Sequence, residues 1–194
     1  MEMGQKGYNE VYLQGHSLGC TKTVYSYKRL IENNDQEVLN KIKAVILLSL
    51  VDIPMAIKFF FPGDAQKLTL YMEDEKRKGN GQNLYFAEGA LIPMCPNTFL
   101  SFVKDNKIID FARYNDEKFE YPELNQIKVP LFMRWGNNNE LIMQDADRLI
   151  NMLNDKIKNV NKNINYIDGA GHNYRGYEEQ LFKEMLEFIS NTVK

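Results

Sequence analysis

Ser17 lies in the sequence context of this chain that is most typical of a nucleophilic side chain. It is the centre of the sequence GHSLG, which follows the apolar run 11–13 and precedes an amphipathic helix pattern that extends to about Ile31. A strand, then G-x-S-x-G, then a helix is the pattern that holds a serine on a strained turn, with its hydroxyl above the sheet edge. Side chains at Gly15 and Gly19 would collide with the crowded backbone of such a turn. The pattern therefore predicts a nucleophilic Ser17.

Histidine is scarce in the chain, which contains only 2. His16 lies inside the GHSLG sequence, and His172 ends the sequence DGAGH. The DGAGH segment follows a strand-like run at 164–167 and precedes a helix pattern. A histidine placed in such a loop can take the proton from a serine hydroxyl during its attack on a substrate. We therefore predict that His172 is the general base for Ser17.

These segments together resemble serine hydrolases of the α/β-hydrolase superfamily, of the esterase or lipase-like kind. The resemblance rests on the elbow GHSLGC, the apolar strand 44–49, the strand and turn 129–136, and the closing GAGH, in that order along the chain. In this family the catalytic order is serine, acid, histidine, and His172 stands where that order requires it. The resemblance implies an acyl-enzyme on Ser17, with no cofactor and no metal.

The position of the triad acid departs from the family's pattern. After the strand 129–135 the chain reads GNNNE, and the residue that matches the family's aspartate is Asn139. An amide can orient the imidazole ring, but it supplies no charge to stabilise the imidazolium. Asp52 is the alternative acid, because it follows an earlier strand where some lipase-like members place theirs. Glu140 is a third alternative, and its side chain is expected to point elsewhere.

The sequence before the elbow is also shorter than the resemblance requires. Only 16 residues precede Ser17, whereas family members carry several strands there and a loop that supplies the second oxyanion donor. The chain supplies the backbone N–H of Leu18, and loss of one donor typically costs about 10²–10³ in rate. We therefore expect the chain to form only the C-terminal part of the family's fold. Strand 10–15 is then expected to be an exposed apolar edge of the sheet, which promotes self-association.

The elements that must position these residues alternate along the chain. This alternation predicts an α/β fold, with a mostly parallel sheet and helices on both faces. With the resemblance, it indicates a single α/β-hydrolase domain over 1–194 that lacks the N-terminal strands. The predicted strands are 10–15, 43–49, 129–135 and 163–167, and the predicted helices are 18–33, 143–158 and 176–192.

The stretch 53–125 interrupts this alternation and is rich in aromatic side chains. Short helix patterns cover 54–61 and 64–78, and a third begins at 97 or 98 and ends at 103. Long connections in compact domains usually have a function. The stretch is therefore predicted to be a helical cap or lid over Ser17, with an ordinary packed excursion as the alternative. An aromatic lid would favour apolar acyl or aryl substrates.

The composition narrows the classes of partner. The chain has 194 residues, 44% of them hydrophobic, and a formal net charge of −2, without a basic patch that would indicate nucleic-acid binding. The longest apolar run, 44–48, is too short to span a membrane, and no signal-peptide pattern is visible, which predicts a cytoplasmic protein. Cys20 and Cys95 fit neither a metal site nor a disulfide framework, and Cys20 is expected to be a buried packing residue.

Two functions are consistent with these patterns. The first is a serine hydrolase that acts on a small-molecule carboxylic ester or thioester, with acyl transfer to another acceptor as a close variant. The second is a non-catalytic α/β-hydrolase-fold fragment that binds a partner or has lost its activity. The presence of Ser17 and His172 favours the first, whereas Asn139 and the short N-terminus favour the second.

Overall fold

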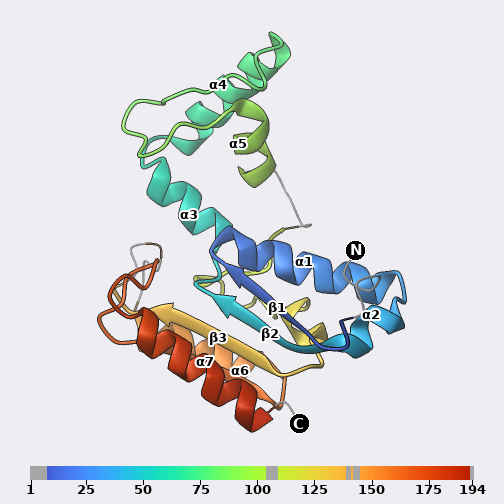
Figure 1. Cartoon of the computed structure of the whole chain (residues 1–194). Coiled ribbons are helices and arrows are strands. Elements are labelled where there is room, and N and C mark those ends of the chain that lie inside the picture. The colour runs from blue at the N-terminus through green and yellow to red at the C-terminus, as the bar shows by residue number, and fades with distance from the viewer. Residues whose placement is uncertain (1–7, 104–108, 139–140, 142–144, 193–194) are drawn as a thin grey trace. The chain divides into compact units, whose positions relative to one another are not determined.

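The computed structural model of this protein describes residues 8–103, 109–138, 141 and 145–192. The chain divides into two compact units (Figure 1). The first, here called the sheet unit, contains the residues up to Val51 together with those from Tyr114 onward. The second, here called the helical unit, spans Asp52–Arg113.

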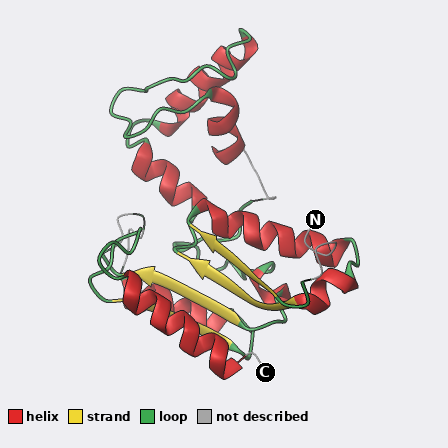
Figure 2. Cartoon of the chain, viewed as in Figure 1, coloured by secondary structure: helices red, strands yellow, loops and turns green. Residues whose placement is uncertain are grey.

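The sheet unit is built on four parallel strands in the order β1-β2-β3-β4 (Figure 2). The four α-helices among its described residues follow or connect these strands, so the α/β fold class predicted from the sequence is confirmed. The strands are β1 (Val11–His16), β2 (Ile42–Leu48), β3 (Leu131–Gly136) and β4 (Lys162–Ile167), and the helices are α1 (Leu18–Glu32), α2 (Gln36–Lys41), α6 (Ala146–Lys156) and α7 (Glu178–Thr192).

Alternating side chains along β1 assign one helix to each face of the sheet. Gly15 faces α1, because its backbone lies against Cys20 in the first turns of that helix. Gln14 and His16 point to the other face, where they line an apolar hollow of about 400 Å³ together with Leu181 of α7. Helices therefore cover both faces, as the strand–helix alternation predicted.

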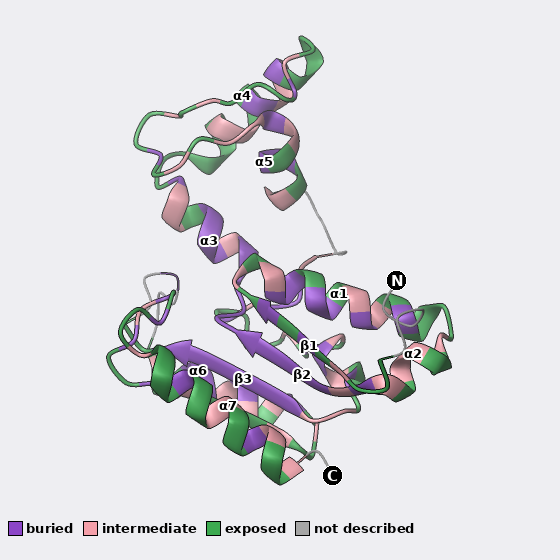
Figure 3. Ribbon diagram, viewed as in Figure 1, coloured by how far each residue is buried: buried purple, intermediate pink, exposed green. Residues whose placement is uncertain are grey.

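The central strands are covered more completely than the strand at the edge. Every residue of β3 and nearly every residue of β2 is buried (Figure 3), as expected for a parallel sheet with both faces covered. On the α7 face, the rings of Phe132 and Phe188 pack with centroids 5.3 Å apart. By contrast, β1 pairs with β2 alone among the described strands, and Tyr12 is 38% exposed. The predicted edge position of strand 10–15 is confirmed, and self-association through it stays a prediction.

The helix α2 was not predicted from the sequence. Asp35 caps it, since its carboxylate accepts a hydrogen bond from the Val38 N–H at 3.3 Å. None of its residues is buried, so it has no apolar stripe to produce a periodic signal. The four strands and the other three α-helices described in the sheet unit lie within three residues of the predicted bounds.

Over its described residues, the helical unit contains three helices and a short antiparallel bridge between Tyr85 and Met94. The Asp64 carboxylate caps α4 by accepting from two backbone N–H groups. Phe61 and Phe99 are buried and meet edge to face at 5.3 Å. The helices are α3 (Ile53–Phe60), α4 (Ala65–Arg77) and α5 (Pro96–Val103).

The segment 114–125, which was predicted to belong to the insertion, is part of the sheet unit. The reason lies in two buried aromatic residues, Tyr114 and Tyr121. The Tyr114 hydroxyl donates to the carbonyl of Leu50, and its ring packs edge-on against Trp135 at 6.2 Å. The segment continues into a short 3₁₀ turn, η2 (Leu124–Gln126).

Over the described residues, no helix has both the length and the apolar character needed to cross a bilayer.

Candidate active site

Ser17 lies between β1 and α1 in a backbone conformation that residues with a side chain seldom adopt. Its φ is 57° and its ψ is −128°. Its N–H donates to the carbonyl of Leu48 at 2.9 Å, which continues the contact with β2 beyond the end of β1. Strain of this kind costs about 1–3 kcal/mol and persists only where the surrounding structure enforces it. The strained strand-to-helix turn predicted from GHSLG is therefore confirmed.

The two glycines of the turn have different roles. A Cβ at Gly15 would lie 2.5 Å from the backbone of Cys20 and of Gly19, so residue 15 has no room for a side chain. A Cβ at Gly19 would meet nothing within 4 Å. The prediction of crowding is confirmed at Gly15 and wrong at Gly19, because residue 19 already belongs to the first turn of α1 and points away from the packed backbone.

This asymmetry gives a test of the turn. Gly15→Ala is expected to lower the free energy of unfolding by about 1–3 kcal/mol, because the new methyl group overlaps the backbone. Gly19→Ala is the matched control, and it is expected to leave the stability unchanged or to raise it by up to about 1 kcal/mol, since alanine favours a helix over glycine. Urea denaturation followed by circular dichroism measures both. Equal effects at the two positions would contradict the described turn.

Cys20 lies directly behind the elbow and is fully buried, as predicted. Its Sγ donates to the carbonyl oxygens of Gly15 and Leu48, at 3.2 and 3.1 Å. Burial raises the pKa of the Cys20 thiol to about 12. The thiol therefore stays protonated at neutral pH and is not a competing nucleophile, because only the thiolate is reactive.

Leu18 is the first residue of α1, and its side chain is 42% exposed. The first N–H groups of a helix have no partner within the helix and carry partial positive charge. The first turn of α1 contains no acidic residue that would oppose an anion there. The Leu18 N–H as an oxyanion donor is compatible with this geometry and stays a prediction.

His172 lies in the loop between β4 and α7 and is 9% exposed. Its backbone carbonyl is 2.9 Å from His16 Nε2, and the centroids of the two rings are 5.0 Å apart. A carbonyl can only accept, so Nε2 of His16 carries the proton in this contact. His16 directly precedes Ser17, and the structure therefore brings the His172 loop to the elbow. The pairing of the Ser17 hydroxyl with a ring nitrogen of His172 stays a prediction.

The loop after β3 is tied to the loop that carries His172. The Asn137 side chain donates to the Asp168 carboxylate at 2.6 Å and accepts from the Gly169 N–H at 2.7 Å. Gly136 approaches so closely that a Cβ would lie 1.9 Å from the carbonyl oxygen of Ala170. The segment that leads to the predicted acid position therefore lies against the His172 loop. The predicted residues Asn139 and Glu140 themselves lie outside the described residues.

Asp52, the alternative acid, is the first residue of the helical unit. Its side chain is buried, and one carboxylate oxygen accepts from the Met55 N–H at 3.0 Å, which caps α3. The carboxylate therefore has a structural role at a helix N-terminus. A second role for Asp52 as the triad acid stays a prediction.

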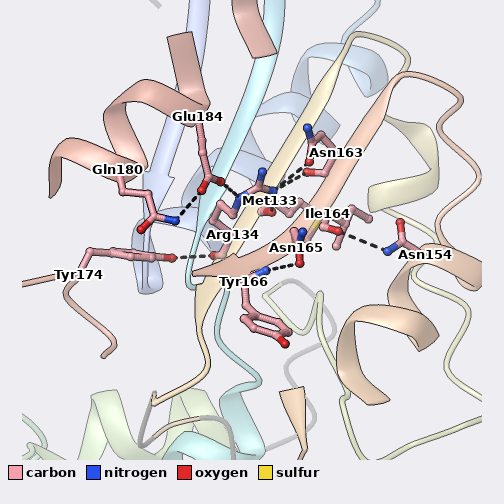
Figure 4. Close-up of polar contacts among 10 residues, drawn as sticks. All are labelled: Met133, Arg134, Asn154, Asn163, Ile164, Asn165, Tyr166, Tyr174, Gln180 and Glu184. Carbon is pink, nitrogen blue, oxygen red and sulfur yellow. Dashed lines mark hydrogen bonds and ion pairs between the residues drawn. The ribbon is translucent and has the colours of Figure 1, made fainter. Parts of the chain in front are cut away.

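The sequence did not predict the residues whose hydrogen bonds hold the His172 loop against the ends of β2 and β3. Ser49 and Tyr174 are buried, with their hydroxyl oxygens 2.9 Å apart. The Tyr174 hydroxyl donates to the carbonyl of Arg134 at 2.7 Å (Figure 4). Both residues have a φ of 53°, in the left-handed region that non-glycine residues rarely occupy. Serine and tyrosine carry no sequence signal for such a backbone.

Arg134 was visible in the sequence as a lone charge in an apolar strand, but its role was not predicted. Its side chain leaves β3 toward α7, where its Nε donates to the Glu184 carboxylate at 2.6 Å (Figure 4). A second donor reaches the Asn163 side chain at 3.0 Å, and the guanidinium lies 4.2 Å from the centroid of the Phe132 ring. Burial lowers the pKa of Arg134, and Glu184 opposes that shift. Arg134 thus joins β3 to β4 and α7.

Comparison with known proteins gives similarity of structure rather than of sequence. No protein-family model matches the chain, and no curated protein sequence matches it. Solved structures match nearly its whole length at low identity. They include the monoacylglycerol lipase of Paleococcus ferrophilus, with 16% identity and a TM-score of 0.54 over 97% of this chain and 72% of the lipase.

Two further structures give the same result. The metagenome-derived lipolytic enzymes LipS and LipT are represented by a structure with 12% identity and a TM-score of 0.55, covering 96% of this chain and 67% of that one. The mouse alpha/beta hydrolase domain-containing protein 10 has 13% identity and a TM-score of 0.52, covering 94% and 63%. The fold expected from the sequence resemblance is therefore confirmed, and this chain spans about two thirds of the length of these structures.

Proposed function

We propose that this chain, which has the α/β-hydrolase fold, is a serine hydrolase that cleaves small-molecule carboxylic esters or thioesters. The observation that carries the proposal is the strained turn at Ser17, next to a His172 loop that is bonded to the adjacent His16 at 2.9 Å. A nucleophile on such a turn, with a histidine beside it, is the arrangement used for acyl transfer. The lipases among the structurally similar proteins favour the same chemistry.

In the proposed reaction, Ser17 Oγ attacks the acyl carbon while His172 takes the hydroxyl proton. The developing oxyanion is stabilised by the N–H of Leu18 at the positive end of α1. The carbon–oxygen or carbon–sulfur bond to the leaving group then breaks, and His172 returns the proton to the departing alcohol or thiol. Water, activated by His172, attacks the acyl-enzyme and releases the carboxylic acid, which restores Ser17.

The third member of the proposed site orients the ring of His172. We assign this role to Asn139, with Asp52 and Glu140 as the alternatives. An amide at this place holds the ring without stabilising its positive charge, which is expected to make the reaction slow. A slow enzyme is the specific form of activity that the proposal predicts.

The helical unit is proposed to act as a cap for the acyl group. Its exposed side chains include several large apolar ones, which would contact an apolar acyl or aryl group in water-poor surroundings. These are Leu70, Tyr71, Leu84, Phe86 and Leu91, each between 46% and 72% exposed.

The test is a panel of p-nitrophenyl esters with acetyl, butyryl and octanoyl groups, together with the matching thioesters. Ser17→Ala provides the blank, because it retains the surface and the two histidines. We expect the wild-type protein to release product faster than Ser17→Ala on at least one substrate, with a preference for the longer acyl groups. An added alcohol that captures the acyl group instead of water would identify the acyl-transfer variant.

The second candidate function is a non-catalytic protein with the same fold. The observation that favours it is the amide at Asn139, where the family's pattern has a carboxylate. It predicts equal product release by wild type and Ser17→Ala across the panel, with both proteins folded by circular dichroism. The same experiment therefore separates the two functions.

A further inference from the structure

The backbone carbonyl of His172 is held from two directions. His16 Nε2 approaches it at 2.9 Å from the end of β1, and Ser49 Oγ approaches it at 3.1 Å from the residue after β2. A carbonyl oxygen has two lone pairs, so both donors can bond at once. One hydrogen bond would satisfy the carbonyl, whereas two donors, at the end of β1 and just after β2, also fix its position.

Ser49 is itself fixed by its surroundings. Its N–H donates to the carbonyl of Arg134 at 2.7 Å, and its φ of 53° directs the side chain toward the His172 loop. The Tyr174 hydroxyl donates to the same carbonyl at 2.7 Å and lies 2.9 Å from Ser49 Oγ. A positive φ thus occurs at three residues in the segments that follow β1, β2 and β4, namely Ser17, Ser49 and Tyr174. Backbone strain concentrated in one place is characteristic of functional sites.

The proton positions in this cluster follow from the donors that are present. The Tyr174 hydroxyl donates its proton in the hydrogen bond to the Arg134 carbonyl. Burial keeps the pKa of Tyr174 above its ordinary value, so the phenol stays neutral. The Ser49 proton is consequently shared between the Tyr174 oxygen and the His172 carbonyl. Removal of the Tyr174 hydroxyl would leave that proton entirely for His172.

We propose that His16 and Ser49 are positioning residues, which set the place of His172 relative to Ser17 by holding its backbone carbonyl. The proposal rests on the proposed function for its catalytic consequence. His16 directly precedes Ser17, so its hydrogen bond connects the backbone next to the nucleophile to the loop that carries the base. Misplacement by about 1 Å can cost on the order of 10² in rate, and loss of either hydrogen bond is expected to cost about tenfold in kcat, with little change in KM.

Two pairs of variants separate positioning from simple loss of structure. His16→Ala removes a donor, whereas His16→Gln keeps an Nε2–H at a similar distance and is expected to restore most of the rate. Ser49→Gly and Ser49→Ala both remove the hydroxyl, but glycine accepts a φ of 53° without strain and alanine does not. If the hydroxyl positions His172, the two Ser49 variants lose equal activity although their stabilities differ.

The decisive measurement does not need activity. Because the chain has only 2 His, protein labelled with ¹³C at histidine Cε1 gives one ring signal from each, assigned by the His16 variants. We expect a single sharp His172 signal in the wild type and in His16→Gln. In His16→Ala and Ser49→Gly we expect it to shift or broaden, and in Tyr174→Phe to change less than in Ser49→Gly.

An unchanged His172 signal in both His16→Ala and Ser49→Gly would overturn the proposal, and so would unchanged kcat in both variants of an active protein. A perturbed signal in a protein without esterase activity would sustain the positioning contact and refute the proposed function instead. The two proposals therefore fail in different ways.

Discussion

His172→Ala is expected to lower ester turnover by at least about 10³-fold, the largest loss that any single side chain outside Ser17 should cause. Without the imidazole, the Ser17 hydroxyl has no base to take its proton, and removal of one triad member in other serine hydrolases abolishes most of the rate enhancement. The measurement is the initial rate with the best p-nitrophenyl ester of the panel, compared with the wild type and with the Ser17→Ala blank.

The second histidine provides the control for this result. His16→Ala removes the other imidazole of the chain, next to Ser17, and is expected to cost about tenfold, because one positioning hydrogen bond is lost. Free imidazole added to His172→Ala is expected to restore part of the rate and to have no such effect on Ser17→Ala. Equal losses in the two histidine variants would contradict the assignment of His172 as the base.

Asn139→Asp is expected to raise ester turnover, by as much as about 10²–10⁴-fold. A carboxylate at the acid position would hold the His172 ring in the required tautomer and stabilise its positive charge in the transition state. The converse change in a serine protease, from aspartate to asparagine, costs about 10⁴ in kcat. The gain should appear in kcat more than in KM, because the charge on the ring develops only during the reaction.

Two further variants assign the role if Asn139→Asp has no effect. Loss of activity in Asp52→Asn would move the acid role to Asp52, although its capping of α3 requires that stability is measured in parallel. Loss in Glu140→Gln would move it to Glu140. Unchanged activity in all three variants would contradict a third member at any of these positions.

The sheet and the elbow could be predicted because their sequence signals are local and strong. The buried strands β2 and β3 are almost uninterrupted apolar runs, as parallel strands covered on both faces must be. The turn at Ser17 is predictable because everything it depends on is close to Ser17 in the sequence. Gly15 has no room for a side chain, and a strand and a helix flank the turn directly. In such cases the sequence pattern and the tertiary structure impose the same requirement.

The contacts that hold His172 could not be predicted, because they join residues far apart in the chain. Ser49 and Tyr174 are separated by 125 positions and meet only when β2 and the loop after β4 are side by side. Their positive φ angles belong to residue types that ordinarily avoid that region. The tertiary structure, and not the local conformational preference of these residue types, determines the two φ angles.

The helical unit ends before the predicted end of the insertion for a related reason. The aromatic residues of 114–125 look like those of the preceding segment, yet Tyr114 and Tyr121 pack in the sheet unit. The hydrogen bond from Tyr114 to the carbonyl of Leu50 and the contact with Trp135 decide this, and neither partner is near in sequence. Composition alone does not distinguish aromatic residues of a cap from aromatic residues of a segment that packs in the core of the sheet unit.

If Ser17 is an activated nucleophile, a fluorophosphonate reacts with it in the folded protein, and the mass of the treated protein reports the adduct. We expect a single phosphonyl adduct that forms slowly and only in part, because an amide at the acid position does not stabilise the charged imidazolium of the base, and peptide mapping is expected to locate the adduct on Ser17. The adduct should be absent from Ser17→Ala and from wild-type protein denatured before treatment, because the strained turn activates the hydroxyl only in the folded state. A folded wild-type protein that gains no adduct, or an adduct that persists in Ser17→Ala, would show that Ser17 is not an activated nucleophile.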